Sequence, residues 1–283
     1  MSTGSEACLE RSKPAGRHRG GFGKHLAIAR LAARQRLEER AVLWGRVLFY
    51  VIILLIFARL WEALLGGSGP VSGAAGQRPS HYIWYLAVTE WIMLSQPLLH
   101  LDIEADLRAG NVGQALSRPL SYVAGKLAEA WGEVAVRLAV LGVCGVACAR
   151  LLGAEWPEPS ALPLAAIAGV LASVVMTLAL AAIGLSALWV TDSTSVYLIW
   201  QKLCFVLGGL MLPLSIYPPW LRSLAEWSPF AALLFGPGEL VLGVPPAHVW
   251  GCLLRLLCWG ALFALALAGL ERRALRIITV HGG

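Results

Sequence analysis

The chain has 283 residues, of which 58% are hydrophobic and only 14% are charged. Because soluble proteins contain about 45–50% apolar and about 25% charged residues, the composition argues against a soluble enzyme and against disorder over most of the chain. The formal net charge is +6, and nine of the 23 Lys and Arg residues lie in the first 41 positions. This placement is typical of the cytoplasmic flank of a membrane protein. No nucleic-acid partner is expected, because no soluble body remains to present a basic face.

The first 41 residues divide into a tail and a helix. Residues 1–23 are rich in Gly, Ser, Arg and Lys, which predicts a disordered basic tail, and they contain no apolar secretory signal. Residues 24–41 lack Pro and Gly and favour a helix. The apolar side chains between Leu26 and Leu37 form one narrow stripe flanked by arginines. We predict an amphipathic helix on the anionic cytoplasmic face of a bilayer; a merely solvated basic helix is the alternative.

Six apolar segments follow, each long enough to cross about 30 Å of hydrocarbon as a helix of roughly 20 residues. Tryptophans lie near their predicted ends, as at membrane–water interfaces. The predicted fold class is all-α: a polytopic membrane protein with six transmembrane helices in one transmembrane domain, residues 42–270. The predicted spans are residues 42–65, 81–101, 127–152, 162–190, 196–217 and 247–270.

The distribution of Lys and Arg predicts the orientation. With the N-terminus in the cytoplasm, the inside segments hold fifteen of these residues and the outside segments hold two, Arg78 and Arg222. Cytoplasmic loops carry such an excess, so both termini are predicted to be cytoplasmic. The inside segments are residues 1–41, 102–126, 191–195 and 271–283, the last being a short tail. The outside segments are residues 66–80, 153–161 and 218–246.

Small residues dominate the third and fourth predicted spans. Gly142 and Gly145 in one span and Gly169 in the other are accompanied by many alanines. Such faces let helices approach closely in lipid. The sequence leaves open whether these faces meet within one subunit or between subunits.

Motifs for catalysis are absent from the sequence. The Gly-Lys pair at Gly23 is followed by His where a Walker-type phosphate loop needs Ser or Thr. There is no H-E-x-x-H zinc helix and no G-x-S-x-G nucleophile elbow. Asp102, Glu104 and Asp106 read as a solvated acidic face, on which only the two aspartates share a side of a helix. We therefore expect no enzyme activity, catalytic residue, metal or cofactor on this chain.

Charged residues inside spans are the strongest candidates for function, because each costs about 2.5–3.5 kcal/mol to insert. Glu90 lies near the middle of the second predicted span. Glu129, Glu133 and Arg137 recur every four residues and share one face of the third. A pair between Glu133 and Arg137 would offset part of its own desolvation. These residues either form a polar seam between helices or line a translocation path.

The inside segment 102–126 has its own pattern. Ala109-Gly110-Asn111 predicts a helix stop, and Arg118-Pro119 would break a second helix. A short helix, a turn and an anchored piece would form a compact protrusion suited to dock a partner. The alternative is a plain connector.

The outside segment 218–246 is long and apolar. Pro218-Pro219 predicts a helix start, Ser228-Pro229 a break, and Gly236-Pro237-Gly238 a further break. We predict short re-entrant helices that dip into the outer leaflet. Any non-helical backbone at that depth must be shielded by protein or water.

These two segments resemble the ABC-2 type permeases, the membrane subunits of bacterial ATP-driven exporters. The inside residues Glu104 to Gly110 and Leu116 to Ser121 are similar to the acidic–basic–Gly stretch and the R-P turn of that family. The outside segment is similar to its aromatic–Pro–x–Trp–Leu and Pro-Phe signature, and the end of the chain resembles the short basic, Gly-ended tail of one branch. The outside residues that carry the resemblance are Pro213, Tyr217, Pro218, Trp220, Leu221, Pro229 and Phe230.

The resemblance implies a half-transporter in the bacterial cytoplasmic (inner) membrane. Two such permeases, identical or paralogous, would form a twelve-span pore driven by separate ABC ATPase subunits, which would carry the ATP and Mg. Residues 24–41 would be the elbow helix, and residues 102–120 would hold the coupling helix. The residues implied in ATPase coupling are Asp102, Glu104, Asp106, Arg108, Gly110, Arg118 and Pro119.

Other functions stay open at this point. A secondary transporter or channel is the first alternative, which interrupted helices would favour. An intramembrane enzyme is the second. The substrate is not identified, since an apolar cavity between helices suits lipids, drugs, peptides or glycans alike.

Overall fold

A computed structural model describes residues 21–65, 79–111, 121–190, 192–243 and 245–281. Most of the predicted tail 1–23, together with Arg118 and Pro119, lies outside these described residues. Within them the chain forms helices and no strand, in agreement with the all-α prediction. The elements are α1 (Gly21–Glu38), α2 (Arg40–Leu65), α3 (Pro79–Leu94), α4 (Leu99–Arg108), α6 (Tyr122–Leu151), α7 (Ala161–Ser186), α8 (Ser193–Val206), the 3-10 helix η1 (Leu214–Ile216), α9 (Pro219–Glu226), α10 (Pro229–Leu233), α11 (Phe235–Leu240) and α12 (Pro246–His281).

Four of the described helices are long and apolar enough to cross a bilayer. They are α2, α6, α7 and α12, with candidate spans Arg40–Ala63, Tyr122–Leu151, Ala161–Ser186 and Ala247–Arg276. Each of these overlaps a predicted span. The chain is therefore a multi-pass membrane protein. The other two predicted spans, 81–101 and 196–217, are interrupted.

The second predicted span is not one continuous helix, because α3 ends at Leu94 and α4 begins at Leu99. Pro97 has no backbone N–H and disfavours helical geometry at the preceding residue, Gln96. Arg46 of α2 pairs with backbone carbonyls at this break. Its Nη1 donates to the carbonyl of Leu94 at 2.7 Å and to that of Gln96 at 3.3 Å. The prediction of a single helix over residues 81–101 is wrong for this reason.

The fifth predicted span, 196–217, is also wrong as a single helix. The helix α8 ends at Val206, and residues 207–213 are non-helical. Gly209 has a φ of +66°, a conformation that side chains with a Cβ rarely adopt. Pro213 then precedes the single turn of η1.

Two hydroxyl groups of α3 stabilise this non-helical segment. Tyr85 Oη donates to the carbonyl of Gly209 at 2.5 Å, and Thr89 Oγ1 donates to that of Leu210 at 3.0 Å. All four groups are buried. Backbone carbonyls at membrane depth need such partners, because lipid offers none.

The helix α12 extends beyond residue 270, the predicted end of the sixth span. The residues predicted as a tail after position 270 continue the helix α12, which runs without a break to His281. Arg272 and Arg273 are exposed on it. The sequence from Ala261 to His281 contains no Pro and only one Gly, so no residue in it strongly opposes the helix.

The predicted outside segment, residues 218–246, contains three short helices among its described residues. As predicted, Pro219 occupies the first turn of α9, and Ser228-Pro229 separates α9 from α10. The predicted break at Gly236-Pro237-Gly238 is wrong, because these residues lie within α11. Proline is tolerated in the first turn of a helix, where its missing N–H would have no helical acceptor. The chain turns instead at Leu234, where α10 ends.

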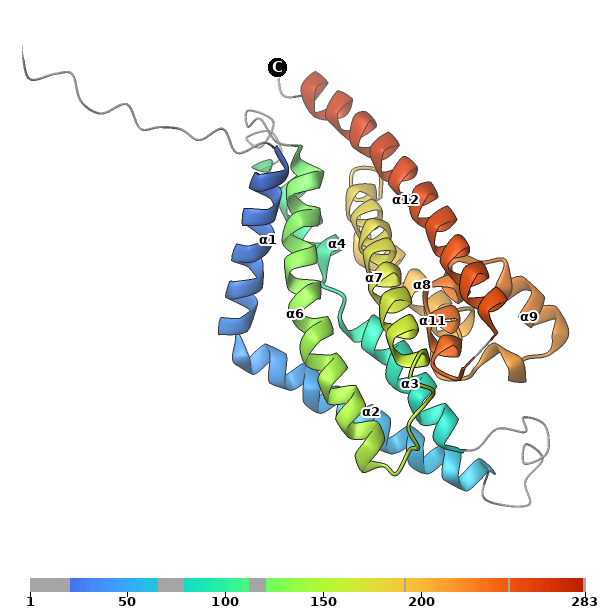
Figure 1. Ribbon diagram of the computed structural model, residues 1–283. Helices are drawn as coiled ribbons and strands as arrows, with labels where there is room; N and C mark the ends of the chain where they lie inside the picture. The colour runs from blue at the N-terminus through green and yellow to red at the C-terminus, as the bar shows by residue number, and fades with distance from the viewer. Residues whose placement is uncertain (1–20, 66–78, 112–120, 191, 244, 282–283) are drawn as a thin grey trace, which may run out of the picture.

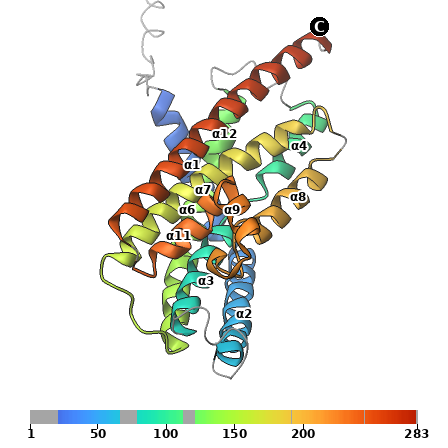
Figure 2. The same cartoon turned by 90° about the vertical axis from the view of Figure 1, so that its right-hand side faces the viewer.

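The long helices lie side by side, with α1 along the first part of α6 and α12 along α7 (Figures 1 and 2). The start of α1, the start of α6 and the end of α12 lie at one end of the molecule (Figure 1). The ends of α2 and α6 lie at the other end. The break between α3 and α4 lies between these ends, so that α4 reaches toward the same end as the start of α6.

The small-residue faces make contacts within the chain. A Cβ added to Gly145 of α6 would lie 2.3 Å from Tyr50 Oη, and one added to Gly169 of α7 would lie 2.5 Å from the Trp91 ring. These glycines therefore let α6 and α7 pack directly against aromatic side chains of α2 and α3. At these positions, the tertiary structure resolves the question that the sequence left open.

Candidate functional site

The helix α4 is attached to the start of α8 through Glu104. The Glu104 carboxylate is buried and accepts hydrogen bonds from the backbone N–H of Ser193, at 3.0 Å, and from its hydroxyl. Ser193 is the first residue of α8, where the helix dipole favours a negative charge. The Ser193 hydroxyl and N–H, with the nearby guanidinium of Arg108, hold the pKa of Glu104 below its usual value against the effect of burial.

The same helix is attached to α6 through Asp106. Its carboxylate accepts hydrogen bonds from Tyr122 Oη at 2.9 Å and from Asn111 Nδ2 at 3.3 Å, and it lies 2.8 Å from Lys126 Nζ. Burial alone would raise the pKa of Asp106, but these donors together outweigh it and lower the pKa. Thus α4 contacts the first turns of two long elements, α6 and α8, through charged side chains.

The structure corrects one prediction for this segment and confirms another. Glu104 is not part of a solvated acidic face, because its side chain is buried against α8. Gly110 has a φ of +71° directly after α4, which confirms the predicted helix stop. Asp102 and Arg108 are exposed.

A charged hollow of about 380 Å³ lies between α1, α4 and α6. Asp102 and Asp106 both line it, which confirms that these two residues share one face of the helix. Five carboxylates and two basic side chains face it, so acidic groups prevail. Its charged lining is Arg36 of α1, Glu39 between α1 and α2, Asp102 and Asp106 of α4, and Lys126, Glu129 and Glu133 of α6. Among the described residues, no group of three or more His, Cys, Asp or Glu residues is placed to hold a metal ion.

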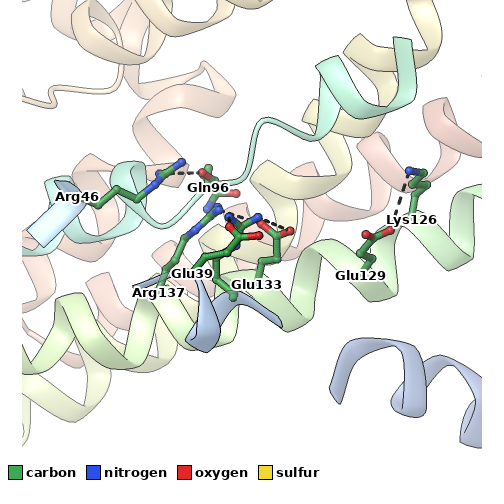
Figure 3. Close-up of polar contacts among 8 residues, drawn as sticks. Glu39, Arg46, Gln96, Lys126, Glu129, Glu133 and Arg137 are labelled. Atoms are coloured by element: carbon green, nitrogen blue, oxygen red, sulfur yellow. Dashed lines mark hydrogen bonds and ion pairs between the residues drawn. The ribbon is translucent and has the colours of Figure 1, made fainter. Parts of the chain in front are cut away.

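Of the three residues of α6 predicted to form a polar seam or to line a path, the structure joins Glu133 and Arg137 but not Glu129 (Figure 3). Glu133 contacts Arg137 at 2.9 Å, as predicted, and its other oxygen lies 2.7 Å from Arg36 of α1. Glu129 lies apart, largely exposed and 4.0 Å from Lys126. Arg137 is 2% exposed, and its Nε and Nη1 have no hydrogen-bond partner among the described residues. The seam joins α1 to α6, which sequence periodicity along α6 alone did not indicate.

Glu90 lies in a separate place, on a cavity of about 330 Å³ between α2, α3, α7 and α8. Its side chain is only 2% exposed, and its Oε1 has no hydrogen-bond partner among the described residues. Trp200 of α8 lines the same cavity, and its indole Nε1 is also buried without a hydrogen-bond partner among the described residues. Sequence analysis did not single out Trp200, since a tryptophan in an apolar span is usually a packing residue.

The outer residues of the predicted signature are placed in different surroundings. Tyr217 Oη donates to the carbonyl of Val206 at 2.8 Å, which links the end of α8 to the residues directly before α9. Phe230 is buried, with its ring centroid 4.9 Å from that of Trp200. Trp220 is exposed, Leu221 is partly buried, and Pro213, Pro218 and Pro229 stand at the starts of η1, α9 and α10.

Comparison with known protein families identifies the family of this chain. The family described as "ABC-2 family transporter protein" matches residues 86–281, which is more than two thirds of the chain. The chain belongs to this family. No curated protein matches the chain. The match begins within α3, runs to the end of α12 and includes Glu90, α4 and the short helices α9–α11. It leaves out α2, which also lines the Glu90 cavity. ABC-2 proteins are membrane components of transporters, so these sites belong to a transport protein.

Proposed function

We propose that this ABC-2 protein is the permease subunit of an ATP-driven exporter in the bacterial cytoplasmic membrane. It would pair with a second permease, identical or paralogous, and take its energy from separate ABC ATPase subunits that bind ATP and Mg. Family membership supports the transport role, and the absence of a phosphate loop from the sequence supports a separate ATPase.

The placement of α4 carries the proposal. This helix presents Asp102 and Arg108 to solvent, while Glu104 and Asp106 attach it to α8 and α6. It also lies against α7, where a Cβ added to Gly184 would be 2.9 Å from Ile103 Cβ. An ATPase that moves α4 would therefore also move α6, α7 and α8, which α4 contacts. This is the behaviour required of a coupling helix, which transfers a ligand-driven change to a two-state helix assembly.

The proposed orientation places α4 and both chain ends in the cytoplasm and the α9–α11 helices outside. The excess of Lys and Arg in the proposed cytoplasmic segments supports it. On α9 and the turn after it, Trp220 and Trp227 are 70% and 86% exposed, as expected for tryptophans at the outer membrane–water interface. In this orientation α1 is the elbow helix.

The first test is affinity purification of the tagged chain from its native membrane. An ABC ATPase is expected to co-purify with the wild-type chain and to be lost with the charge reversal Arg108→Glu on exposed α4. Arg59→Glu, in α2, changes an exposed arginine elsewhere and is expected to retain the ATPase. A wild-type chain that brings down no ATPase would overturn the proposal.

A second variant separates docking from transmission. Glu104→Gln removes the charge that holds Ser193 but leaves the exposed residues of α4 in place. We expect it to retain the ATPase and to lose much of the transport-dependent ATP hydrolysis. Loss of ATPase binding in this variant, with Arg108→Glu unaffected, would contradict the assigned roles.

One observation favours a second candidate function, a secondary transporter. The interruptions at residues 95–98 and 207–213 are of the kind that forms ion and substrate sites in such proteins. Family membership favours the exporter. Reconstitution of the purified chain in liposomes decides between them, because only a secondary transporter would move substrate without an ATPase and ATP.

A further inference from the structure

A second groove, of about 340 Å³, lies among α2, α3, α6 and α7. It shares no described lining residue with the Glu90 cavity. Trp84 and Trp91 of α3 line it together with Gly142 of α6. Pro163 and Ala166 of α7 also line it and are exposed, so the groove opens to the surroundings of the chain.

The described lining of this groove offers no free polar atom on a side chain. Tyr50 Oη, Trp84 Nε1 and Trp91 Nε1 each donate to a backbone carbonyl at 2.7 Å. The other lining residues are glycine, proline or aliphatic. A bound water needs two to four polar partners, and an empty space of this size would forfeit packing contacts. The occupant that suits such a lining is therefore a hydrocarbon.

Membrane hydrocarbon has direct access to this groove. Val143 of α6 and Ile167 of α7 adjoin lining residues in sequence and are 74% and 59% exposed. Both helices are candidate membrane spans. In a bilayer the surface between them faces acyl chains. An acyl chain is thus the hydrocarbon that reaches the groove without leaving the membrane.

A basic and aromatic cluster lies beyond one end of the groove. Arg150 follows the lining residue Val146 by one helical turn, on the same side of α6. Its Cζ lies 5.0 Å from the centre of the Trp156 ring, and that ring lies 6.0 Å from the ring of the lining residue Trp84. The helix rises about 12 Å between Gly142 and Arg150. The guanidinium therefore stands where the headgroup of a lipid would lie if its chain occupied the groove.

The charge of Arg150 is not neutralised by a neighbouring carboxylate. Its Nη1 donates to the carbonyl of Ala154, and neither Glu155 nor Glu158 forms an ion pair with it in the described structure. The carboxyl of Glu158 lies elsewhere, because its Cδ would be 3.4 Å from a Cβ added to Gly243. Arginine binds phosphate oxygens through charge-assisted hydrogen bonds, and tryptophans favour the headgroup level of a bilayer.

We propose that this groove holds an acyl chain of an anionic phospholipid, whose phosphate lies against Arg150. In the proposed orientation the site belongs to the outer leaflet. The inference goes beyond the proposed function, because it assigns a resident lipid that fills the space between α6 and α7 and not a transported substrate. The apolar lining selects the acyl chain, and the arginine selects a lipid with net negative charge over a zwitterionic one.

The test is native mass spectrometry of the full chain, freed of lipid in detergent and titrated with phosphatidylglycerol or phosphatidylcholine of the same acyl chains. We expect the wild type to bind its first phosphatidylglycerol about fivefold more tightly than its first phosphatidylcholine, because a basic side chain attracts the anionic lipid. Glycerol 3-phosphate carries the phosphate without acyl chains and is expected not to bind. Binding of this probe would assign the site to free phosphate esters and overturn the inference.

Two variants separate the chain site from the headgroup site. Ala166→Phe fills the groove from its exposed edge and is expected to weaken binding of the first phosphatidylglycerol about tenfold or more, since the acyl chain loses its apolar site. Arg150→Gln leaves the groove unchanged and is expected to abolish the preference for phosphatidylglycerol. Unchanged lipid binding in Ala166→Phe, a preference retained in Arg150→Gln, or equal binding of both lipids by the wild type would overturn the inference.

Matched controls make the same chemical changes away from the site. Ala147→Phe alters an exposed alanine of α6 outside the described lining, and Arg59→Gln removes an exposed arginine of α2. Both are expected to bind lipid as the wild type does, and elution volume and unfolding temperature report whether each variant is folded. A lower dimer fraction in Ala166→Phe with unchanged lipid binding would assign the groove to a second copy of the chain instead. No ATPase is present, so the outcome is independent of the export proposal.

Discussion

The contact between α1 and α6 gives the sharpest test of the structure. A Cβ added to Gly132 of α6 would lie 2.1 Å from the carbonyl oxygen of Ala29 and 2.9 Å from its carbonyl carbon. Ordinary contact begins near 3.4 Å, so α1 would have to move by roughly 1.3 Å. The obstructing atoms are backbone, which cannot rotate away. The substitution Gly132→Ala therefore requires displacement of the whole helix.

Over-packing of this kind costs about 1–3 kcal/mol. The same displacement would stretch the contact between Arg36 and Glu133, which is 2.7 Å long and adjacent to Gly132 in sequence. We therefore expect Gly132→Ala to lower the free energy of unfolding and to expose α1. The measurements are the unfolding temperature of the purified chain and the rate of trypsin cleavage at the exposed Arg30 and Arg34.

Gly125 supplies a matched control in the same helix. A Cβ at this position meets nothing within 4 Å. Because Ala is better than Gly in a helix by about 0.5–1 kcal/mol, Gly125→Ala is expected to be neutral or stabilising. The two identical chemical changes should thus have opposite signs. If Gly132→Ala were as stable and as resistant to trypsin as Gly125→Ala, the packing of α1 on α6 would be wrong.

Three further predictions concern charges and hydroxyls. Glu133→Gln leaves the buried Arg137 without the carboxylate that it contacts, while Arg36 keeps its pair with Glu39, and it is expected to cost about 3–5 kcal/mol of unfolding free energy. Glu62→Gln, at an exposed pair, should change it by less than about 0.5 kcal/mol; equal unfolding temperatures would contradict this. Tyr85→Phe removes the donor to the buried Gly209 carbonyl and should cost about 1–3 kcal/mol; an unchanged unfolding temperature would argue against that bond. Because the pKa of Glu104 is lowered in the folded chain, its ionised form stabilises the fold at neutral pH, and this stabilisation is lost as the pH falls below the ordinary carboxyl pKa of about 4.3. The difference in unfolding temperature between wild type and Glu104→Gln should therefore shrink in acid, and a pH-independent difference would refute the assignment.

Much of the fold could be predicted from one-dimensional patterns. The all-α class and four spans followed from apolar length, because a bilayer demands about 20 apolar residues in one helix. The helix stop at Gly110 and the start of α9 at Pro219 followed from local backbone chemistry. The pair between Glu133 and Arg137 followed from helical spacing. Each of these depends on residues close together in sequence.

Two of the errors came from contacts between distant segments. The spans expected at residues 81–101 and 196–217 are broken, because Arg46 and Tyr85 supply hydrogen bonds that let the backbone leave the helix in an apolar environment. A hydropathy pattern contains no information about such hydrogen-bond donors.

The predicted break at Gly236 is wrong for a local reason, because a helix is possible where Pro falls in its first turn.

The candidate site shows the same division. The sequence marks Glu90 as a costly buried charge, and it predicts a protrusion suited to dock a partner, or else a plain connector, after Asp102. It did not show that Glu104 is buried on Ser193, about ninety positions away, or that Trp200 lines the Glu90 cavity. It grouped Glu129 with Glu133 and Arg137, in either a polar seam or a translocation path, whereas the structure places Glu129 near Lys126 instead.

What the sequence by itself determined is the membrane character of the chain, its helical class and the family resemblance that the comparison bears out, since hydropathy and short motifs are local properties. Only the tertiary structure decided where the helices break, which carboxylates are paired and which one is left facing a cavity. Those outcomes depend on donors and aromatic rings brought together from helices far apart in the chain, and burial, which fixes their energetic weight, exists only once the helices have packed.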